Sequence, residues 1–366
     1  MLAAEPRLGS LSGNDPIRLG QLAAAADADR LRAHVEAIAR PRNRLNAADE
    51  MERAETYAAG ALADAGWEVE RRPFTVTDVL GVPDHRVDGE LHPRLRYERL
   101  EGANLLALKR GAAGGRAILV GAHLDTVRDS PGADDNGSGV AAVLELARIL
   151  APLSFRRDVL LAIFDMEEIG CFGSRELARE LRARGEPAAA IVLESVGFVD
   201  RRPGSQIVPP RMGAIYRGQV RRIEQRGRRG DWSLVVFRRP SLALARMLGE
   251  ALAHLEGREA VVLTRDPLDL PLLGSVLDRL GLWTAEFGRS DHAEFWAEGV
   301  PAVQLTDTAN FRNPNYHEPG DLPETLDYQR LAAIVAATAL TVSRVAGTAA
   351  APARKGASMN HLGATA

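Results

Sequence analysis

Three apolar runs in this chain are each followed directly by acidic or histidine side chains. The run AILVGA precedes HLD, VLLAIF precedes DMEE, and AAAIVL precedes Glu194. Continuous apolar runs bounded by glycine or polar residues are typical of strands that are buried on both faces of a parallel sheet. Because ligands are held at the carboxyl ends of such strands, the pattern predicts an α/β fold with a functional site at one edge of the sheet.

Segments with apolar residues at helical spacing alternate with these strands. We expect helices over residues 27–40, 47–65, 140–150, 174–184, 241–254 and 326–345. The alternation predicts a single three-layer α/β domain over residues 27–346, in which helices cover a central, mostly parallel (mixed) sheet. Residues 1–26 are expected to form a flexible N-terminal arm, and residues 347–366 a disordered tail.

The segment 201–231 differs from the rest of the domain, because it holds nine arginines against two acidic residues, with several prolines and glycines. We expect an insertion or lid here rather than a nucleic-acid contact, since the interleaved aromatic residues that bind single strands are missing. Residues that select the substrate side chain are expected between Gly197 and Gly281.

A formal net charge of −3 over 366 residues gives the chain no general attraction to nucleic acid or anionic membranes. Cys171 is the only cysteine, which excludes a disulfide framework and a Cys-based zinc ribbon. No apolar stretch approaches the roughly 20 residues of a membrane-spanning helix, and the first residues lack a signal-peptide core. We therefore expect a cytoplasmic protein without nucleic-acid or membrane partners.

The first two acidic segments favour a metal site. His123 and Asp125 lie two residues apart, so on an extended chain their side chains point the same way, and Asp125 is placed to orient His123. The turn PGADDNGSG then puts Asp134 and Asp135 before a helix. An Asx turn with a helix cap explains one of these acids, but two adjacent acids favour a carboxylate that bridges cations.

Glu167 and Glu168 point in different directions at the end of the next strand, so one can bind a metal while the other acts as a base. A surface acidic turn is the alternative interpretation. The candidate ligands are two imidazoles and three carboxylates, a set that suits zinc, manganese or cobalt rather than calcium. They are His123, Asp135, Glu168, Glu194 and His317. If one carboxylate bridges, the set provides a two-metal hydrolytic site.

The motifs HLD, ADDNGSG, MEEIG, LES, RSDH and YHEPGD, in this order, resemble those of the co-catalytic dizinc aminopeptidases. The clan of these enzymes also holds glutamate carboxypeptidases and glutaminyl cyclases. The resemblance covers roughly residues 26–345 and implies the zinc-exopeptidase fold with two divalent metal ions, expected to be zinc.

The resemblance also implies a role for each site residue. His123, Asp135 and Glu194 match the ligands of one metal, and Asp135, Glu168 and His317 those of the other, with Asp135 bridging. Several well-known aminopeptidases have aspartate where this chain has Glu194. The remaining matches are Glu167 as general base, Tyr316 as donor to the transition-state oxygen, Asp125 as partner of the histidine ligand, and Arg289, Asp291 and His292 as substrate-binding residues.

The function implied is a metal-dependent exopeptidase, an aminopeptidase that removes N-terminal residues from peptides through a metal-bridging water with Glu167 as general base. A carboxypeptidase or a glutaminyl cyclase on the same scaffold remains an alternative, as does a catalytically inactive binding module. A carboxypeptidase needs a fixed cation, which Arg289 or an arginine of segment 201–231 provides. The oligomeric state stays open.

Overall fold

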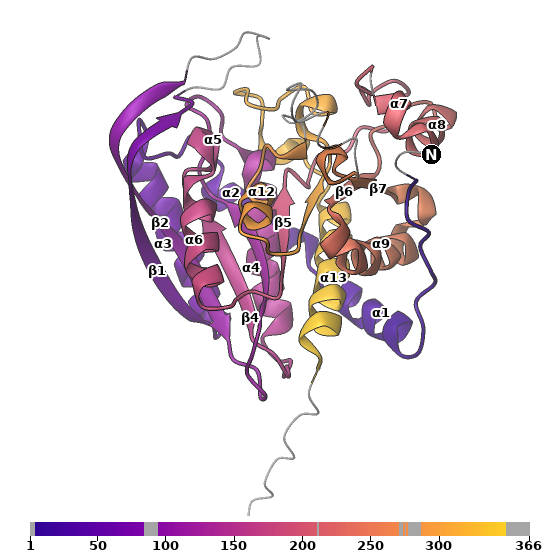
Figure 1. Cartoon of the computed structure of the whole chain (residues 1–366), viewed down its shortest axis with the longest axis horizontal. Helices are drawn as coiled ribbons and strands as arrows, with labels where there is room; N and C mark the ends of the chain where they lie inside the picture. Colours follow the sequence, from indigo (N-terminus) through magenta and orange to yellow (C-terminus); the bar gives the residue numbers. More distant parts are fainter. Residues whose placement is uncertain are drawn as a thin grey trace, which may run out of the picture.

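The computed structural model describes residues 4–83, 94–210, 212–270 and 287–348, together with residues 274 and 276. Its strands form one eight-stranded mixed sheet in the order β1-β2-β4-β3-β5-β8-β6-β7 (Figure 1). The strands are β1 (Glu68–Gly81), β2 (Leu95–Lys109), β3 (Ile118–His123), β4 (Val159–Phe164), β5 (Ala189–Glu194), β6 (Ser233–Phe237), β7 (Val261–Arg265) and β8 (Ala302–Thr306).

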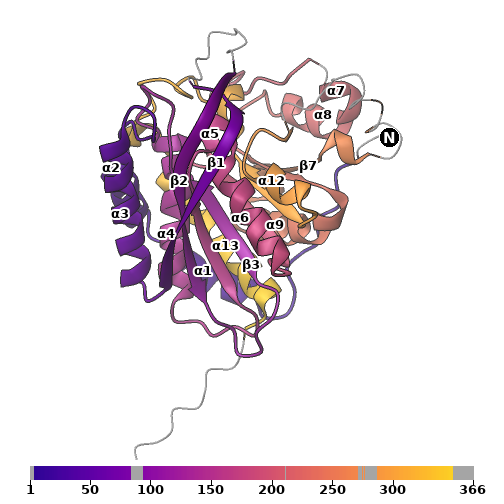
Figure 2. The same ribbon diagram turned by 60° about the vertical axis from the view of Figure 1, so that its left-hand side comes forward.

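The centre of the sheet is parallel. Strands β4, β3, β5 and β8 run the same way, while β2 joins β4 in antiparallel fashion and β6 joins β8 likewise. The long antiparallel pair β1–β2 twists along one edge of the sheet (Figure 2). The four central strands therefore end at the same edge, where the predicted ligands follow them.

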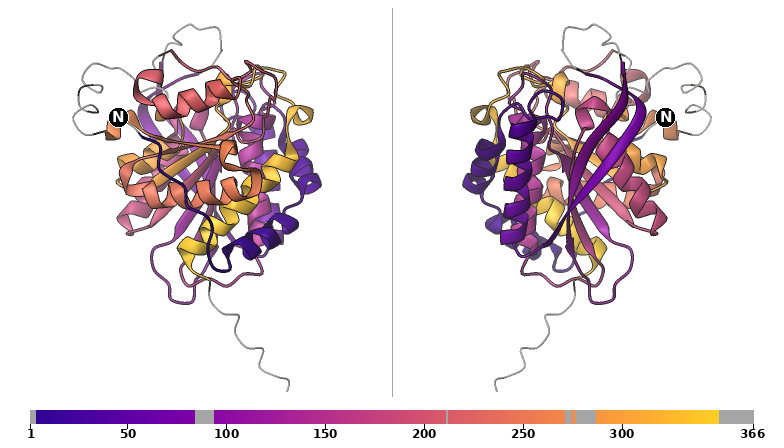
Figure 3. Two further views of the ribbon diagram at one scale, coloured as in Figure 1. Left: turned by 90° about the vertical axis from the view of Figure 1, so that its right-hand side faces the viewer. Right: turned by 90° about the vertical axis from the view of Figure 1, so that its left-hand side faces the viewer.

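Helices cover both faces of the sheet, which confirms the predicted three-layer α/β architecture. Helices α1, α2, α3, α4, α9 and α13 share one core with one face, and α6 and α12 share a second core with the other (Figures 1 and 3). The bounds are α1 (Asp15–Ala25), α2 (Ala28–Ile38), α3 (Ala48–Asp64), α4 (Gly139–Leu150), α5 (Glu167–Gly170), α6 (Phe172–Ala183), α7 (Met212–Ile215), α8 (Arg217–Gln225), α9 (Leu242–Glu256), α12 (His292–Ala297) and α13 (Tyr328–Ala346).

Strand residues alternate between the two cores, as the pleat requires. In β8, Val303 and Leu305 face the core with α13, whereas Ala302 packs with α12. The described residues also form short helical turns, which are η1 (Ala133–Ser138), η2 (Arg239–Ser241), η3 (Arg258–Ala260), η4 (Pro267–Asp269), η5 (Ala309–Phe311) and η6 (Pro323–Thr325).

Two details differ from the sequence expectations. The flexible arm expected over residues 1–26 is wrong for α1, because Leu19 and Leu22 bury their side chains against α13. Strand β6 was not expected, although its SLVVF sequence is apolar. The predicted tail beyond residue 348 lies outside the described residues. Within the part of the chain that the structure describes, every helix is too short or too polar to cross a membrane.

Candidate active site

The five predicted ligands converge at the carboxyl edge of the sheet although they come from five separate segments. His123 and Glu194 are the last residues of β3 and β5. Asp135 lies in η1, Glu168 lies in α5, and His317 follows η5. The side chains of all five are buried, with at most a tenth of each exposed.

Asp135 lies between the two histidines. Its Oδ1 is 3.3 Å from His123 Nε2, and its Oδ2 is 3.1 Å from His317 Nε2. Each imidazole also faces a glutamate: His123 Nε2 is 3.3 Å from Glu194 Oε1, and His317 Nε2 is 3.4 Å from Glu168 Oε2. The arrangement therefore consists of two half-sites that share one carboxylate, as the resemblance implies.

The charges of this cluster perturb one another strongly. Burial alone would lower the pKa of His317, but Glu168 and Asp135 raise it to about 10. Burial likewise favours a low pKa for His123, which nearby Glu194 and Glu167 instead hold well above its ordinary value. For Asp135, burial favours the neutral form, but the two imidazoles lower its pKa. The cluster thus concentrates carboxylate charge that needs positive charge nearby.

The donor set fits divalent metal ions. Neither carboxylate oxygen of Asp135 accepts a hydrogen bond of ordinary geometry in the described structure, although both are buried. Buried polar atoms without such partners are rare and call for an explanation. Ligand atoms of His123, Asp135 and Glu168 lie within 4.8 Å of one another, and so do those of His123, Glu167 and Glu194. Imidazole nitrogens and carboxylate oxygens are ligands that zinc accepts.

Asp125 supports two parts of the cluster. Its carboxylate accepts hydrogen bonds from the backbone N–H groups of Glu167 (3.0 Å) and Glu168 (3.1 Å). His123 Nδ1 lies 3.1 Å from the backbone oxygen of Asp125 and 3.6 Å from its carboxylate. The backbone of Asp125 thus lies closer to the imidazole than the carboxylate does, and the carboxylate fixes the turn that carries both glutamates.

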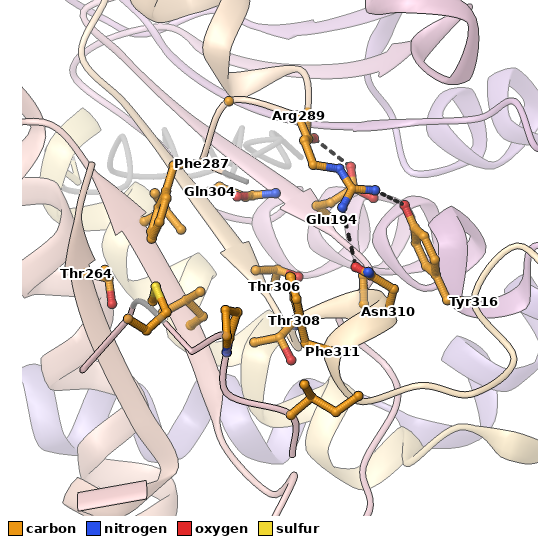
Figure 4. Close-up of a pocket in the computed structure, with 18 of the residues that line it drawn as sticks. Glu194, Thr264, Phe287, Arg289, Gln304, Thr306, Thr308, Asn310, Phe311 and Tyr316 are labelled. Carbon is orange, nitrogen blue, oxygen red and sulfur yellow. Dashed lines mark hydrogen bonds between the residues drawn. The ribbon is translucent and has the colours of Figure 1, made fainter. Parts of the chain in front are cut away.

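Glu167 and Tyr316 line the cavity next to the ligands. Glu167 Oε2 is 3.9 Å from His123 Nε2, and burial together with Glu194 and Glu168 raises the pKa of Glu167 well above its ordinary value. Burial also raises the pKa of the Tyr316 phenol, which keeps it protonated and able to donate. Arg289 donates to the Tyr316 hydroxyl at 3.3 Å and to Asn310 Oδ1 at 3.4 Å (Figure 4).

The three predicted substrate-binding residues do not lie together. Arg289 lines the cavity, but Asp291 and His292 are fully buried and do not. His292 Nε2 lies 2.9 Å from the Phe287 carbonyl, and its ring packs edge-on against Trp296 with centroids 4.4 Å apart. Asp291, in contrast, is buried close enough to His123 and Glu194 for their charges to affect its pKa. Neither residue lines the cavity, and their role in substrate binding stays a prediction.

Two supporting residues had no role in the sequence prediction. The Asp321 carboxylate accepts the N–H groups of Asp134 (2.9 Å) and Asp135 (3.1 Å), which ties the turn after His317 to η1. Arg42 is fully buried and donates to backbone carbonyls before and after the predicted ligands. The one sequence signal for either residue is that Asp321 follows the predicted ligand His317 by four residues.

The cavity beside the cluster has a volume of about 680 Å³. Its lining includes Ser290, whose hydroxyl donates to Glu194 Oε2 at 2.6 Å, and Cys171, whose Sγ is 3.7 Å from Glu167 Oε1. Helices α7 and α8, from the predicted insertion, contribute another wall.

A family model described as Peptidase family M28 matches residues 104–226 and 269–342, more than half of the chain. The matched stretches contain all five predicted ligands. They leave out residues 227–268, which form β6, α9 and β7.

Curated relatives match parts of the chain, and YfbL and LpqL are two examples. Escherichia coli (strain K12) YfbL, described as uncharacterized, is 34% identical over 237 residues, which are 62% of this chain and 66% of that protein. The probable lipoprotein aminopeptidase LpqL of Mycobacterium tuberculosis is 30% identical over 150 residues, 40% of this chain and 30% of LpqL. The chain thus spans less than two thirds of the length of these relatives.

Solved structures share the fold at low sequence identity. An aminopeptidase from Aneurinibacillus sp. strain AM-1 aligns with a TM-score of 0.62 at 16% identity, covering 90% of this chain and 97% of the other. BSAP, a zinc aminopeptidase from Bacillus subtilis, gives 0.61 at 15% identity, covering 87% and 95%. The glutaminyl cyclase of Porphyromonas gingivalis gives 0.57 at 17% identity, covering 88% and 99%.

Proposed function

The chain belongs to peptidase family M28, and on this premise we propose that it is a zinc-dependent aminopeptidase that removes N-terminal residues from peptides. The observation that carries the proposal is the position of Asp135, whose two carboxylate oxygens each face a different histidine at 3.1–3.3 Å. The description of the Bacillus subtilis neighbour as a zinc aminopeptidase supports the choice of metal and reaction.

The proposed zinc ligands are His123, Asp135 and Glu194 in one half-site, and Asp135, Glu168 and His317 in the other. Zinc bound there supplies positive charge that acidifies water and polarises a peptide carbonyl. The protein contributes fixed, buried ligands, so little reorganisation is needed when substrate binds.

Glu167 is the proposed general base. Its side chain lines the cavity beside the ligands, 3.9 Å from His123 Nε2, which is the position that a general base for water attack requires. It takes the proton of the water that attacks the scissile carbonyl and then delivers it to the amine that leaves. Asp125 holds the Glu167 backbone N–H, so the carboxylate is presented from a fixed turn.

Tyr316 is the proposed donor to the oxyanion. Its phenol is protonated, and Arg289 donates to the same oxygen. Because the Tyr316 oxygen accepts from Arg289, its own proton is left to point toward the developing negative charge. Glu194 and Glu167 also line the cavity with carboxyl oxygens that can accept hydrogen bonds from the ammonium group of a free peptide N-terminus.

The test compares one peptide in three forms: free, N-terminally acetylated and C-terminally amidated, each incubated with zinc-loaded protein and followed by mass spectrometry. An aminopeptidase cleaves the free and amidated forms and spares the acetylated one. A carboxypeptidase cleaves the free and acetylated forms and spares the amidated one. A peptide that begins with glutamine and loses only ammonia indicates a cyclase. Elemental analysis measures the zinc content, expected at two ions per chain. Cleavage of the acetylated peptide from its C-terminus would overturn the proposal.

A further inference from the structure

The floor of the cavity is a regular part of the sheet. The strand register places Glu194, Thr306, Leu234 and Val262 in one row across β5, β8, β6 and β7. A second row on the same face, two residues back, contains Gln304, Val236 and Thr264. All seven residues line the cavity.

This floor leads away from the metal ligands. Glu194 belongs to the proposed zinc site, and strands are spaced about 4.8 Å apart, so the first row extends roughly 14 Å from Glu194 to Val262. Glu194 is the only ionisable residue in the two rows. The floor thus changes from charged to uncharged within one strand of the ligands.

The described residues of segment 206–223 that line the cavity are uncharged, and they form the roof over the far part of the floor. Val208, Met212 and Val220 are among them. Ile223 and Trp232 pack together with Val262 and close the far end. Trp232, Leu234, Val236, Val262 and Thr264 lie within residues 227–268, which the family model leaves out, so the family match alone does not define this part of the chamber.

Gln304 differs from the two other glutamines that line the cavity, because Gln206 donates to Thr308 and Gln219 donates to the Leu263 carbonyl. The Gln304 side chain is only 8% exposed, it points into the cavity (Figure 4), and its amide has no hydrogen-bond partner in the structure described. Its neighbours in the row across the strands are apolar or hydroxyl-bearing side chains. Because this amide faces the cavity, a ligand that fills the space beside it must offer a hydrogen-bond partner, or the amide loses its contact with water at a cost in free energy.

We propose that the chamber binds a long, uncharged side chain of the first residue of the substrate, and that Gln304 hydrogen-bonds the tyrosine hydroxyl, which makes tyrosine the preferred residue. This inference rests on the proposed function, because it places the free amino group of the substrate near Glu194. From there Gln304 is one strand across and two residues back, roughly 8 Å between Cα atoms. Tyrosine carries its hydroxyl at the far end of the ring, where it can pair with the Gln304 amide, whereas phenylalanine has no polar atom there and leaves that amide unpaired.

The experiment measures kcat/KM for aminoacyl-p-nitroanilides of tyrosine, phenylalanine, leucine, lysine and glutamate with zinc-loaded enzyme. We expect tyrosine to exceed phenylalanine about tenfold, the range of one net neutral hydrogen bond. Lysine and glutamate are expected to be poor substrates, because burying an unpaired charge in this chamber is costly.

Gln304→Met keeps the length of the side chain and removes the amide, so the tyrosine-to-phenylalanine ratio of kcat/KM is expected to fall to about one. Thr264→Val is the matched control, because it removes a hydroxyl from the same row and is expected to keep the ratio of the wild type. A ratio that falls with Thr264→Val and stays with Gln304→Met overturns the assignment to Gln304.

A binding measurement separates this inference from the proposed function. Calorimetry compares tyrosinamide and phenylalaninamide binding to zinc-loaded Glu167→Gln protein, with and without Gln304→Met. A preference for tyrosinamide that Gln304→Met abolishes supports the chamber assignment even when no aminoacyl substrate is hydrolysed, in which case the proposed function alone fails. Equal binding of the two amides overturns the inference.

Discussion

Arg42 is the residue whose removal tests how this chain holds its metal ligands. Its guanidinium is fully buried and donates to the carbonyl oxygens of Leu124 (2.6 Å), Pro131 (2.7 Å), Gly132 (3.0 Å) and Ile38 (3.0 Å). Burial lowers its pKa to about 10, so it is charged at neutral pH. One side chain thus joins the end of α2 to the segment that runs from His123 toward Asp135.

Arg42→Met keeps an unbranched chain and removes all the donors. The Gly132 and Ile38 carbonyls keep another donor, from Gly137 and Arg40, but among the described residues no other group donates to those of Leu124 and Pro131. Each buried oxygen left without a partner costs about 1–3 kcal/mol. Relief from burying a charge offsets part of this, so we expect the free energy of unfolding to fall by about 3 kcal/mol.

Urea denaturation of metal-free protein measures the loss of stability, and competition with a chelating dye measures zinc affinity. Because the segment that the guanidinium holds begins next to His123 and leads to Asp135, zinc affinity is expected to fall about 10–100-fold, as when other residues that orient ligands are removed. Arg40→Met is the matched control, since the Arg40 side chain is 61% exposed and pairs only loosely with Glu50 at 3.6 Å. An Arg42→Met protein with unfolding free energy within 1 kcal/mol of wild type and unchanged zinc affinity refutes the reasoning.

Four further outcomes test the site and its surroundings. Glu167→Gln is expected to keep full zinc content by elemental analysis and to lose kcat by about 10²–10⁴-fold, because only the base is removed. Tyr316→Phe is expected to lower kcat about 10²–10³-fold through the loss of one donor to the oxyanion, with peptide KM little changed. Chelation is expected to lower the melting temperature measured by circular dichroism, and added zinc to restore it, since metal bound only to the folded chain stabilises it. Burial raises the pKa of Asp165 to about 6, above its value in the unfolded chain, so the folded state binds more protons between about pH 4 and 6. The free energy of unfolding is therefore expected to fall by about 3 kcal/mol as the pH rises through this window. Asp165→Asn is expected to flatten that fall when unfolding is measured by denaturant titration at several pH values.

The central strands were predictable because their sequences are continuous apolar runs, and a strand buried on both faces needs such a run. The strands near the edge of the sheet were harder to predict from the sequence. Strand β6 is five residues long and follows the arginine-rich segment, so its short apolar sequence gave no separate signal. Helix α1 was missed because its contact with α13 joins the two ends of the domain, and local sequence does not record such contacts.

The candidate site shows the same division. The positions of His123 and Glu194 followed from the strands that end there, since parallel strands carry their last residues to one edge. The motif around Asp291 and His292 predicted that both residues lie near the site, but it could not predict which way their side chains point. His292 begins α12, and its helical position turns the ring toward Trp296 rather than the cavity. Arg42 donates a hydrogen bond to Leu124, which is more than 80 residues away in the sequence, and no local sequence pattern predicts such a contact.

The register of one sheet links the proposed chemistry to the proposed specificity. Glu194 pairs with Thr306 of β8, and this pairing puts Gln304 on the same face, two residues back. A slip of one residue between β5 and β8 would turn Gln304 toward α13 and bring Val303 to the cavity, because side chains alternate along a strand. Strand β8 is held on both sides, by β5 and by β6, so such a slip would also break the pairing that places Leu234 and Val236 on the floor. The metal ligand and the residues that select the substrate are therefore fixed by one set of backbone hydrogen bonds, and sequence changes that preserve this register can alter selectivity at position 304 without moving Glu194.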